Sequence, residues 1–182
     1  TFRAEVARRS LQEFGPLIIN DISAAELDPA MVDVVAEYEV PYIAMHMRGT
    51  PQTMQRNTLY EGDITSAVCD YFRQRVEFLR SRGVRNVILD PGFGFAKDIN
   101  QNYQLMAELD QFKQLNAPLL VGISRKSMIY RPLDITPQTA INGTTVLNTF
   151  ALLHGANILR VHDVKEAVEA VKIIDLIKQN TP

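Results

Sequence analysis

The 182-residue chain is 46% hydrophobic and 22% charged, with a formal net charge of −2 at neutral pH. This composition indicates one globular domain with a sizeable core, and it lacks the basic excess of proteins that bind nucleic acid or anionic membrane surfaces. No apolar run reaches the roughly 18–20 residues of a membrane span, and the single Cys69 excludes an intrachain disulfide and favours a reducing compartment such as the cytoplasm.

The first segment, TFRAEVARRSLQEFG, predicts a helix that runs to Phe14 and ends at Gly15. A sequence that opens within a helix is expected to be part of something longer. Five near-continuous apolar runs follow and predict parallel strands buried on both faces. These runs cover residues 17–22, 41–47, 86–92, 117–124 and 156–163.

Amphipathic segments separate the predicted strands. They predict helices that open at Asp28 and Pro29, span 63–82, 100–115 and 137–154, and follow Asp163. Strict alternation of strand and helix predicts a single α/β domain with a parallel sheet or barrel. The polar stretch 47–63 is the one long connection, and long loops at strand ends are often functional.

Side chains alternate between the two faces of a strand, so one face of each run can be followed to its carboxyl end. Asp21 and His46 fall on the opposite face and are interpreted as structural hydrogen-bonding residues. If the other faces converge, they bring together Asn20, Met45, Asp90, Gly122, Lys126, Arg160 and His162. Charged groups so close to a core are costly unless they are paired or bind a ligand. Because ligands of α/β folds bind at the carboxyl ends of strands, this set predicts a site for an anionic or oxygen-rich small molecule.

Each motif also has a structural interpretation. Ser124 to Ser127 could be a basic solvated loop, and Asp90 before Pro91 has the residue pattern of a turn. The glycines of GFGF (92–95) are a weak phosphate motif and are better explained by a tight strand-to-loop turn.

Five sequence blocks, taken together, resemble the dihydropteroate synthase family of pterin-binding enzymes. They are IINDIS (18–23), MHMRGTPQTMQ (45–55), LDPGFGFAK (89–97), VGISRKSMI (121–129) and ILRVHDVKE (158–166). The resemblance implies a (β/α)8 TIM-barrel family fold, of which residues 1–182 supply about the last five βα units and lack the N-terminal three. It also implies the condensation of 6-hydroxymethyl-7,8-dihydropterin diphosphate with 4-aminobenzoate to 7,8-dihydropteroate in folate biosynthesis.

The same resemblance implies roles for individual residues. The pterin would be bound by Asn20, Met45, Asp90, Gly122, Lys126 and Arg160. The 4-aminobenzoate would be bordered by Phe95, Lys126 and Ser127, and the diphosphate would be held by Arg160 and His162. Lys126, Arg160 and His162 would be the catalytic residues of a dissociative reaction, in which positioning and charge stabilisation replace a nucleophile.

The resemblance also implies a bound metal ion, a second subunit and units that this chain lacks. Mg²⁺ would bind through the diphosphate and a residue expected upstream of Thr1, with no metal ligand in this chain, and the enzyme would be a homodimer. The absent units would carry that ligand, two mobile loops and a pterin-binding Asp immediately before Thr1. The sequence also departs from the family pattern at Ala140, where relatives often carry Arg.

Three other functions are compatible with the residues. Lys126 could form a Schiff base in an aldolase-like barrel, with Asp90 relaying protons. A pterin-dependent methyltransferase barrel would share the pterin-recognising Asp and Asn, but it has no need of the Lys126, Arg160 and His162 anion site. The chain could also be an inactive fragment, and residues 1–182 alone are expected to show little synthase activity.

Overall fold

The computed structural model describes residues 1–50, 52–54 and 58–180. Within these ranges, five short parallel strands follow one another in chain order. They are β1 (Ile19–Asp21), β2 (Tyr42–Met45), β3 (Val87–Asp90), β4 (Leu120–Val121) and β5 (Ile158–Leu159). β2 pairs with β1 and β3, β4 pairs with β5, and a bridge between Leu89 and Leu119 joins the two groups. The predicted parallel α/β architecture is therefore confirmed.

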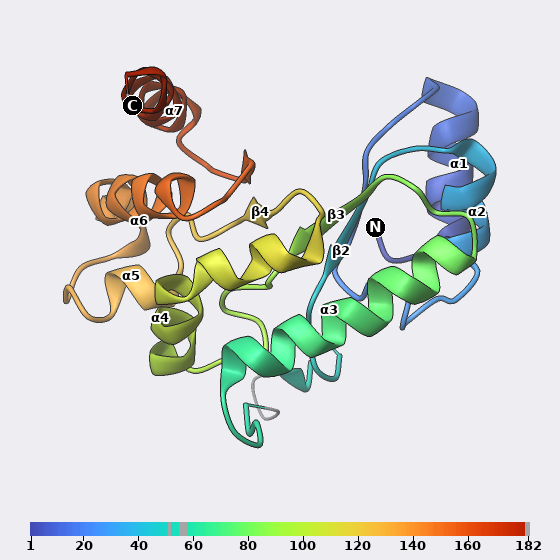
Figure 1. Ribbon diagram of the computed structural model, residues 1–182, viewed down its shortest axis with the longest axis horizontal. Coiled ribbons are helices and arrows are strands. Elements are labelled where there is room, and N and C mark those ends of the chain that lie inside the picture. The colour runs from blue at the N-terminus through green and yellow to red at the C-terminus, as the bar shows by residue number, and fades with distance from the viewer. Residues whose placement is uncertain (51, 55–57, 181–182) are drawn as a thin grey trace.

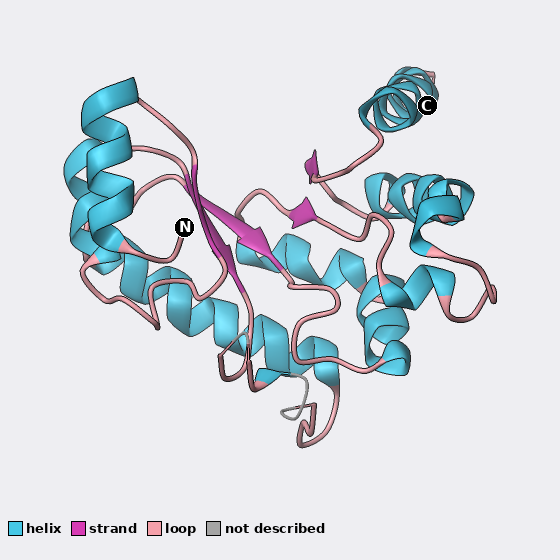
Figure 2. Cartoon of the chain, turned by 180° about the vertical axis from the view of Figure 1, so that it is seen from behind, coloured by secondary structure: helices cyan, strands magenta, loops and turns pink. Residues whose placement is uncertain are grey.

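Helices cover the outer face of this arc and connect each strand to the next. They are α1 (Ala4–Phe14), α2 (Met31–Tyr38), α3 (Ile64–Ser81), α4 (Ile99–Ala107), α5 (Ser127–Tyr130), α6 (Ile141–Leu153) and α7 (Val164–Gln179), with short 3₁₀ helices η2 (Leu109–Leu115) and η3 (Pro137–Thr139). Figure 1 shows α1 and α2 at one end of the sheet and α6 and α7 at the other. Figure 2 shows β1 to β3 side by side from behind. In the described part of the chain, no helix has the length and apolarity needed to cross a membrane.

Local sequence signals explain the helix ends. Gly15 adopts a φ of 79° and its N–H donates to Leu11 O, which ends α1 as predicted. Asp98 caps α4 in a reciprocal capping box with Gln101, and the Asp63 carboxylate accepts from the Ser66 N–H at the start of α3.

Two helix predictions need correction, and one helix was missed. The second helix begins at Met31, because Asp28 instead accepts from the backbone N–H of Ala4 at 2.7 Å and Ala30 at 3.2 Å. The helix predicted over 100–115 divides at Glu108 into α4 and η2. The four-residue α5 was not predicted, because one turn is too short to show helical periodicity.

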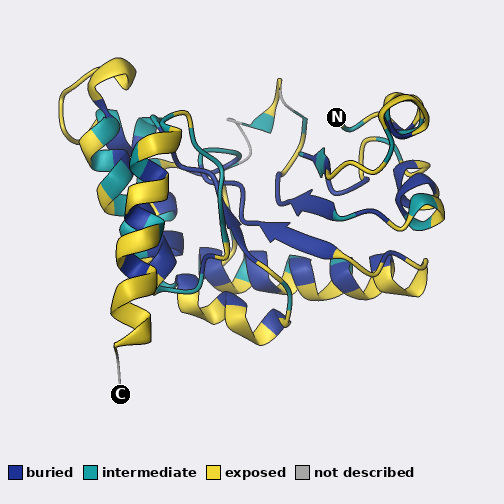
Figure 3. Ribbon diagram, turned by 90° about the horizontal axis from the view of Figure 1, so that it is seen from above, coloured by how far each residue is buried: buried dark blue, intermediate teal, exposed yellow. Residues whose placement is uncertain are grey.

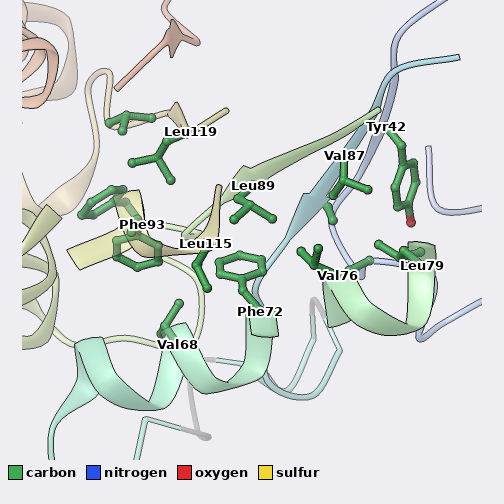
Figure 4. Close-up of a cluster of buried hydrophobic side chains, with 14 of the residues drawn as sticks. Tyr42, Val68, Phe72, Val76, Leu79, Val87, Leu89, Phe93, Leu115 and Leu119 are labelled. Carbon is green, nitrogen blue, oxygen red and sulfur yellow. The ribbon is translucent and has the colours of Figure 1, made fainter. Parts of the chain in front are cut away.

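The main core lies between the outward face of the strands and the helices. Figure 4 shows Phe72 of α3 beneath Leu89 of β3, with Val76 and Leu79 further along α3 toward Tyr42 of β2. The side chains of Tyr42, Phe72 and Leu89 have no exposed surface. Figure 3 shows the buried strands and the exposed outer stripes of α3 and α7. This packing fixes the positions at which the strands end.

The inward face of the arc carries a smaller apolar cluster of Ile43, Ile88, Leu120 and Ile158. These four residues lie on the same face of β2 to β5, so the residue two places further along each strand also faces inward. The inward layer nearest the carboxyl ends therefore contains Met45, Asp90, Gly122 and Arg160.

Candidate functional site

The inward layer brings three predicted site residues from distant parts of the chain into one hydrogen-bonded group. One terminal nitrogen of Arg160 donates to Asp90 Oδ2 at 2.7 Å, and the other donates to Asn20 Oδ1 at 2.9 Å. Asp90 is 1% exposed, and its second oxygen accepts from the backbone N–H of Gly92 at 2.9 Å. The carboxylate is thus held in one orientation by its own turn and faces Arg160.

Gly122 makes room for this arrangement. A Cβ at this position would lie 2.7 Å from a terminal nitrogen of Arg160. Any side chain at residue 122 would therefore push the guanidinium away from Asp90, which gives a physical reason for glycine in the predicted set.

The Asp90–Asn20 pair binds a planar array of hydrogen-bond donors, the guanidinium of Arg160. A guanidinium is planar and presents adjacent N–H groups in a fixed geometry. A 2-amino-4-oxopyrimidine ring, as in pterins, presents a similar planar array of ring N–H and exocyclic NH₂.

Lys126 lies across the turn that follows β3. Its Nζ donates to the backbone oxygen of Phe93 and stands 4.9 Å from the ring centroid of Phe95. Burial lowers the pKa of Lys126 to about 8; Asp90 opposes this shift and Arg160 adds to it. The N–H groups of Lys126 Nζ can donate to a ligand carbonyl.

A cavity of about 190 Å³ lies beside this group and is lined by three side chains that are cationic or can become so. Its lining residues are Gly122, Ser124, Lys126, Arg160, Val161 and His162. His162 Nδ1 and Ser124 Oγ share a hydrogen bond of 3.0 Å, and the His162 N–H donates to the same hydroxyl at 3.2 Å. Ser124 thereby orients the imidazole, and the cavity has the charge and size for an anionic group.

Other predicted site residues are placed less directly. Met45 has no exposed surface and packs near Gly92, so it does not face open space. Ser127 lines a separate cavity of about 610 Å³ that also contacts Lys97, Tyr130 and Arg131. Phe95 contacts this group through Lys126, whose Nζ lies over its ring. Residues 51 and 55 of the 45–55 block lie outside the described residues.

The two residues predicted to face away do so. Asp21 accepts from the hydroxyl of Tyr42 at 2.7 Å and from the backbone N–H groups of Ser23 and Ala25 at 2.8 Å. His46 is 3% exposed and is hydrogen-bonded to Lys97. Both are structural, as expected from strand alternation.

Two features of the site were not predicted. Arg125 makes a bidentate pair with Asp163, with bonds of 3.0 and 2.5 Å, and so ties the turn after β4 to the start of α7. Lys97 is 3% exposed behind the turn after β3. The sequence signals for Lys97 were a lone charge in the otherwise apolar segment 91–97 and its place at the end of the block LDPGFGFAK (89–97).

The described residues do not form a metal centre. Within them, no group of three or more His, Cys, Asp or Glu side chains converges in a way that could hold a metal ion. Mg²⁺ prefers several oxygen ligands, so these residues do not fit a protein-made magnesium site. Ala140, the departure noted in the sequence, is completely buried at the start of α6, where an arginine would need new space.

Parallel strands in chain order, outer helices and a cluster of polar side chains at the carboxyl ends of the strands define an α/β fold of the barrel type. The model of the family described as pterin binding enzyme matches residues 1–162. The chain therefore belongs to the pterin binding enzyme family.

Relatives support this assignment. The chain is 41% identical over 177 residues to the dihydropteroate synthase of Escherichia coli strain K12, covering 96% of this chain and 62% of the relative. It superposes with a TM-score of 0.93 on a Yersinia pestis dihydropteroate synthase in complex with a sulfonamide drug, at 36% identity, over 100% of this chain and 66% of the other. A Thermus thermophilus dihydropteroate synthase in complex with 4-aminobenzoate gives a TM-score of 0.91 at 34% identity, over 97% and 68% of the two chains.

These matches settle the fold class. The chain has the (β/α)8-barrel family fold, and the five strands of its described residues supply five consecutive βα units. It spans 62% of the length of the Escherichia coli relative.

Proposed function

We propose that this chain forms the pterin- and diphosphate-binding part of a dihydropteroate synthase. The observation that carries the proposal is that Asp90 and Asn20 both accept hydrogen bonds from the planar guanidinium of Arg160. The edge of a pterin ring offers the same array of donors. The cation-lined cavity beside it supports the second half of the substrate, the diphosphate. Relatives of the same family at 34–41% identity carry this activity in their names.

The reaction joins two substrates by substitution at the pterin methylene carbon. The carbon–oxygen bond to diphosphate breaks, the amine nitrogen of 4-aminobenzoate bonds to that carbon, and the nitrogen loses one proton. Asp90 and Asn20 hold the ring, and Lys126 donates to its carbonyl. Arg160, once released from Asp90, lies over the ring and joins His162 at the departing diphosphate. Fixed charges at the position where charge develops are the main source of rate enhancement in such a site.

The 4-aminobenzoate is proposed to bind beside Phe95, Lys126 and Ser127. Lys126 already stands over the Phe95 ring, and Ser127 opens into the adjoining cavity of about 610 Å³. A sulfonamide that mimics 4-aminobenzoate should compete for this place. If excess 4-aminobenzoate does not displace a bound sulfonamide, the pocket assignment is wrong.

The anion cavity separates this proposal from its alternatives. A pterin-dependent methyltransferase shares the Asp and Asn but needs no site built from Lys126, Arg160 and His162. A Schiff-base enzyme would use Lys126 as a nucleophile, and borohydride reduction in the presence of a carbonyl substrate would then trap a covalent adduct on it. We expect no adduct.

The remaining proposals concern the surroundings of the enzyme. Mg²⁺ would enter with the diphosphate and a ligand outside residues 1–182, and no step above depends on it. A homodimer is supported by apolar side chains exposed on α7, among them Val164, Ile173 and Leu176. The buried thiol of Cys69 suits the reducing cytoplasm.

The first test compares two ligands that differ only in the diphosphate. Arg160 and His162 are two residues apart on one face, so replacing both by Ala should weaken the diphosphate-bearing dihydropterin far more than the plain hydroxymethyl dihydropterin. Charge-assisted hydrogen bonds are each worth about 1.5–3 kcal/mol, so the difference should be at least roughly tenfold in Kd. Equal losses for the two ligands in calorimetry would show that the pair recognises the ring and not the anion.

A further inference from the structure

Lys97 is a buried lysine with a complete set of hydrogen bonds. Its Nζ lies 3.0 Å from His46 Nδ1, 3.1 Å from the backbone oxygen of Gly92 and 3.0 Å from that of Phe95. The residue is 3% exposed. An ammonium is a donor only and carries three protons, so His46 Nδ1 accepts and every proton of Lys97 is used.

This arrangement rules out two common roles for a buried lysine. With all three protons on protein acceptors, the ammonium has none left for a ligand. Its three hydrogen-bond partners are uncharged, so it is not one half of a conventional buried ion pair. A buried charge of this kind is costly unless its hydrogen bonds compensate for the lost water. The function of Lys97 must therefore lie in what its acceptors hold in place.

Two of those acceptors, the backbone oxygens of Gly92 and Phe95, belong to the turn that presents the pterin-binding and aminobenzoate-binding residues. Gly92 N–H fixes Asp90, and Gly92 O accepts from both Lys97 and the Phe95 N–H at 3.0 Å. The turn is pressed against the end of β2, because a Cβ at Gly92 would lie 2.1 Å from His46 O. Lys97 thus links the end of β2 to both ends of the turn.

We propose that Lys97 is a positioning residue for the synthase site. It clamps the turn of residues 90–97 between Gly92 and Phe95, so that the Asp90 carboxylate and the Phe95 ring keep the spacing needed to hold pterin and 4-aminobenzoate together. The clamp itself follows from the geometry of the turn, whereas its purpose in the reaction rests on the proposed function.

The electrostatic surroundings act on the charge of Lys97 in both directions. Burial lowers the pKa of Lys97 to about 7; Asp90 opposes this shift, and Lys126 adds to it. Burial, helped by Lys97 and Arg48, also holds the pKa of His46 well below its ordinary value, so His46 is a neutral acceptor. Asp90 is the one nearby group among these that favours the charged form of Lys97.

The test needs no enzymatic activity, because the chain contains no tryptophan. In a Phe95→Trp background, the single introduced indole reports directly on the turn. Lys97→Met keeps the length of the side chain but removes all three donors, and it should raise the acrylamide quenching constant of this indole by roughly twofold through local loosening. Lys113→Met, which removes an exposed lysine on η2 paired with Asp110, is the matched control and should leave quenching unchanged.

Two results would overturn the clamp. The first is a folded Lys97→Met variant, judged by circular dichroism, whose indole quenching equals that of the control. If Lys97→Met does not fold, Lys97→Gln in the same background takes its place. The amide of this variant has only two N–H donors on a shorter side chain, so it cannot replace all three hydrogen bonds, and unchanged quenching in a folded form of it is the second such result.

The purpose of the clamp is tested separately. In an active barrel, Lys97→Met should raise the KM for 4-aminobenzoate more than it lowers kcat, because the aromatic amine is proposed to bind at the Phe95 end of the turn. A loosened indole in the quenching experiment with an unchanged KM would overturn the link to catalysis but not the clamp. Absence of synthase activity in the parent barrel would instead contradict the proposed function.

Discussion

Asp90 has one fixed oxygen and one oxygen directed at Arg160. In Asp90→Asn, the side-chain oxygen will stay on the Gly92 N–H, and the new NH₂ will face the donor edge of the ligand. Donor then opposes donor, so pterin binding should weaken by about 2–4 kcal/mol. Calorimetry with 6-hydroxymethyl dihydropterin measures the loss, and Asp70→Asn on the exposed face of α3 is the control. Equal affinities of wild type and Asp90→Asn would refute the assignment of this residue.

Lys97 also predicts how stability changes with pH. Its pKa falls from an ordinary 10.5 to about 7 in the folded state. Below pH 7 both the folded and the unfolded chain carry the proton, and the folded state bears the full cost of burying the charge. Between pH 7 and 10.5 the unfolded chain still binds a proton that the folded chain has released, so this group makes stability rise with pH.

Urea unfolding at several pH values measures this effect. The unfolding free energy of the wild type relative to Lys97→Met should increase between pH 6 and pH 9.5, by more than about 1 kcal/mol for a shift of this direction and size. Lys113→Met should follow the wild type. A difference between wild type and Lys97→Met that stays constant over this range would show that Lys97 titrates normally.

At the scale of elements, the turn after β3 depends on a glycine for two reasons. Gly92 has a φ of 69°, and an added Cβ would meet His46 O at 2.1 Å. Gly62 has a similar φ of 78°, but nothing lies within 4 Å of its added Cβ. Replacing each glycine by alanine therefore separates the cost of backbone strain, which both positions share, from the cost of the steric clash, which occurs at Gly92.

We expect Gly62→Ala to cost only the left-handed backbone term, about 1–2 kcal/mol. Gly92→Ala should cost about 3 kcal/mol or more, because β2 and the turn must also move apart. Thermal or urea unfolding of both variants checks this. Similar losses would mean that the contact between the turn and β2 is not tight.

The elements that the sequence predicts well are those with long periodic signals. The five apolar runs predict the strands and their parallel order, and α3 was predicted within one residue at each end. The side-chain alternation around Ile43, Ile88 and Leu120 placed Asp90 and Gly122 on the inward face for the same reason. The spacing of apolar residues and the length of an apolar run depend only on neighbouring residues, so both can be read from the sequence.

Other features depend on contacts between distant residues. Asp28 does not open the second helix because it accepts a hydrogen bond from the backbone N–H of Ala4. The clamp formed by Lys97 depends on a hydrogen bond to His46, which is 51 positions away in the sequence. The hydrogen bond from Arg160 to Asn20 spans 140 residues and depends on a rotamer that no sequence pattern specifies. The proposed substrate roles came from the family resemblance, whereas this pairing came from the structure.

At the scale of the whole molecule, the described strands form an arc with β1 and β5 at its two edges. A closed barrel of this family has eight strands and about 250 residues, so five units leave the inward face accessible to water. Arg160 is already 40% exposed, although its partner Asp90 is 1% exposed. Water weakens every charge interaction at such a site, and unpaired strand edges favour association with other chains.

These considerations predict that residues 1–182 by themselves show little synthase activity and that closing the barrel restores it. The part of the Escherichia coli relative that lies outside its matched region can be joined to residues 1–182 to complete the barrel. The Asp90→Asn form of the same chimera is the control for a specific site. Circular dichroism and cooperative thermal unfolding establish that each protein is folded.

The most direct measurement is the formation of 7,8-dihydropteroate from the dihydropterin diphosphate and 4-aminobenzoate by these three proteins. The predicted result is turnover by the completed barrel, a loss of kcat/KM of at least roughly thirtyfold in its Asp90→Asn form, as the roughly 2–4 kcal/mol of lost binding requires, and little or no turnover by residues 1–182. A folded completed barrel that makes no product, or one whose rate is unaffected by Asp90→Asn, would contradict the proposed synthase site.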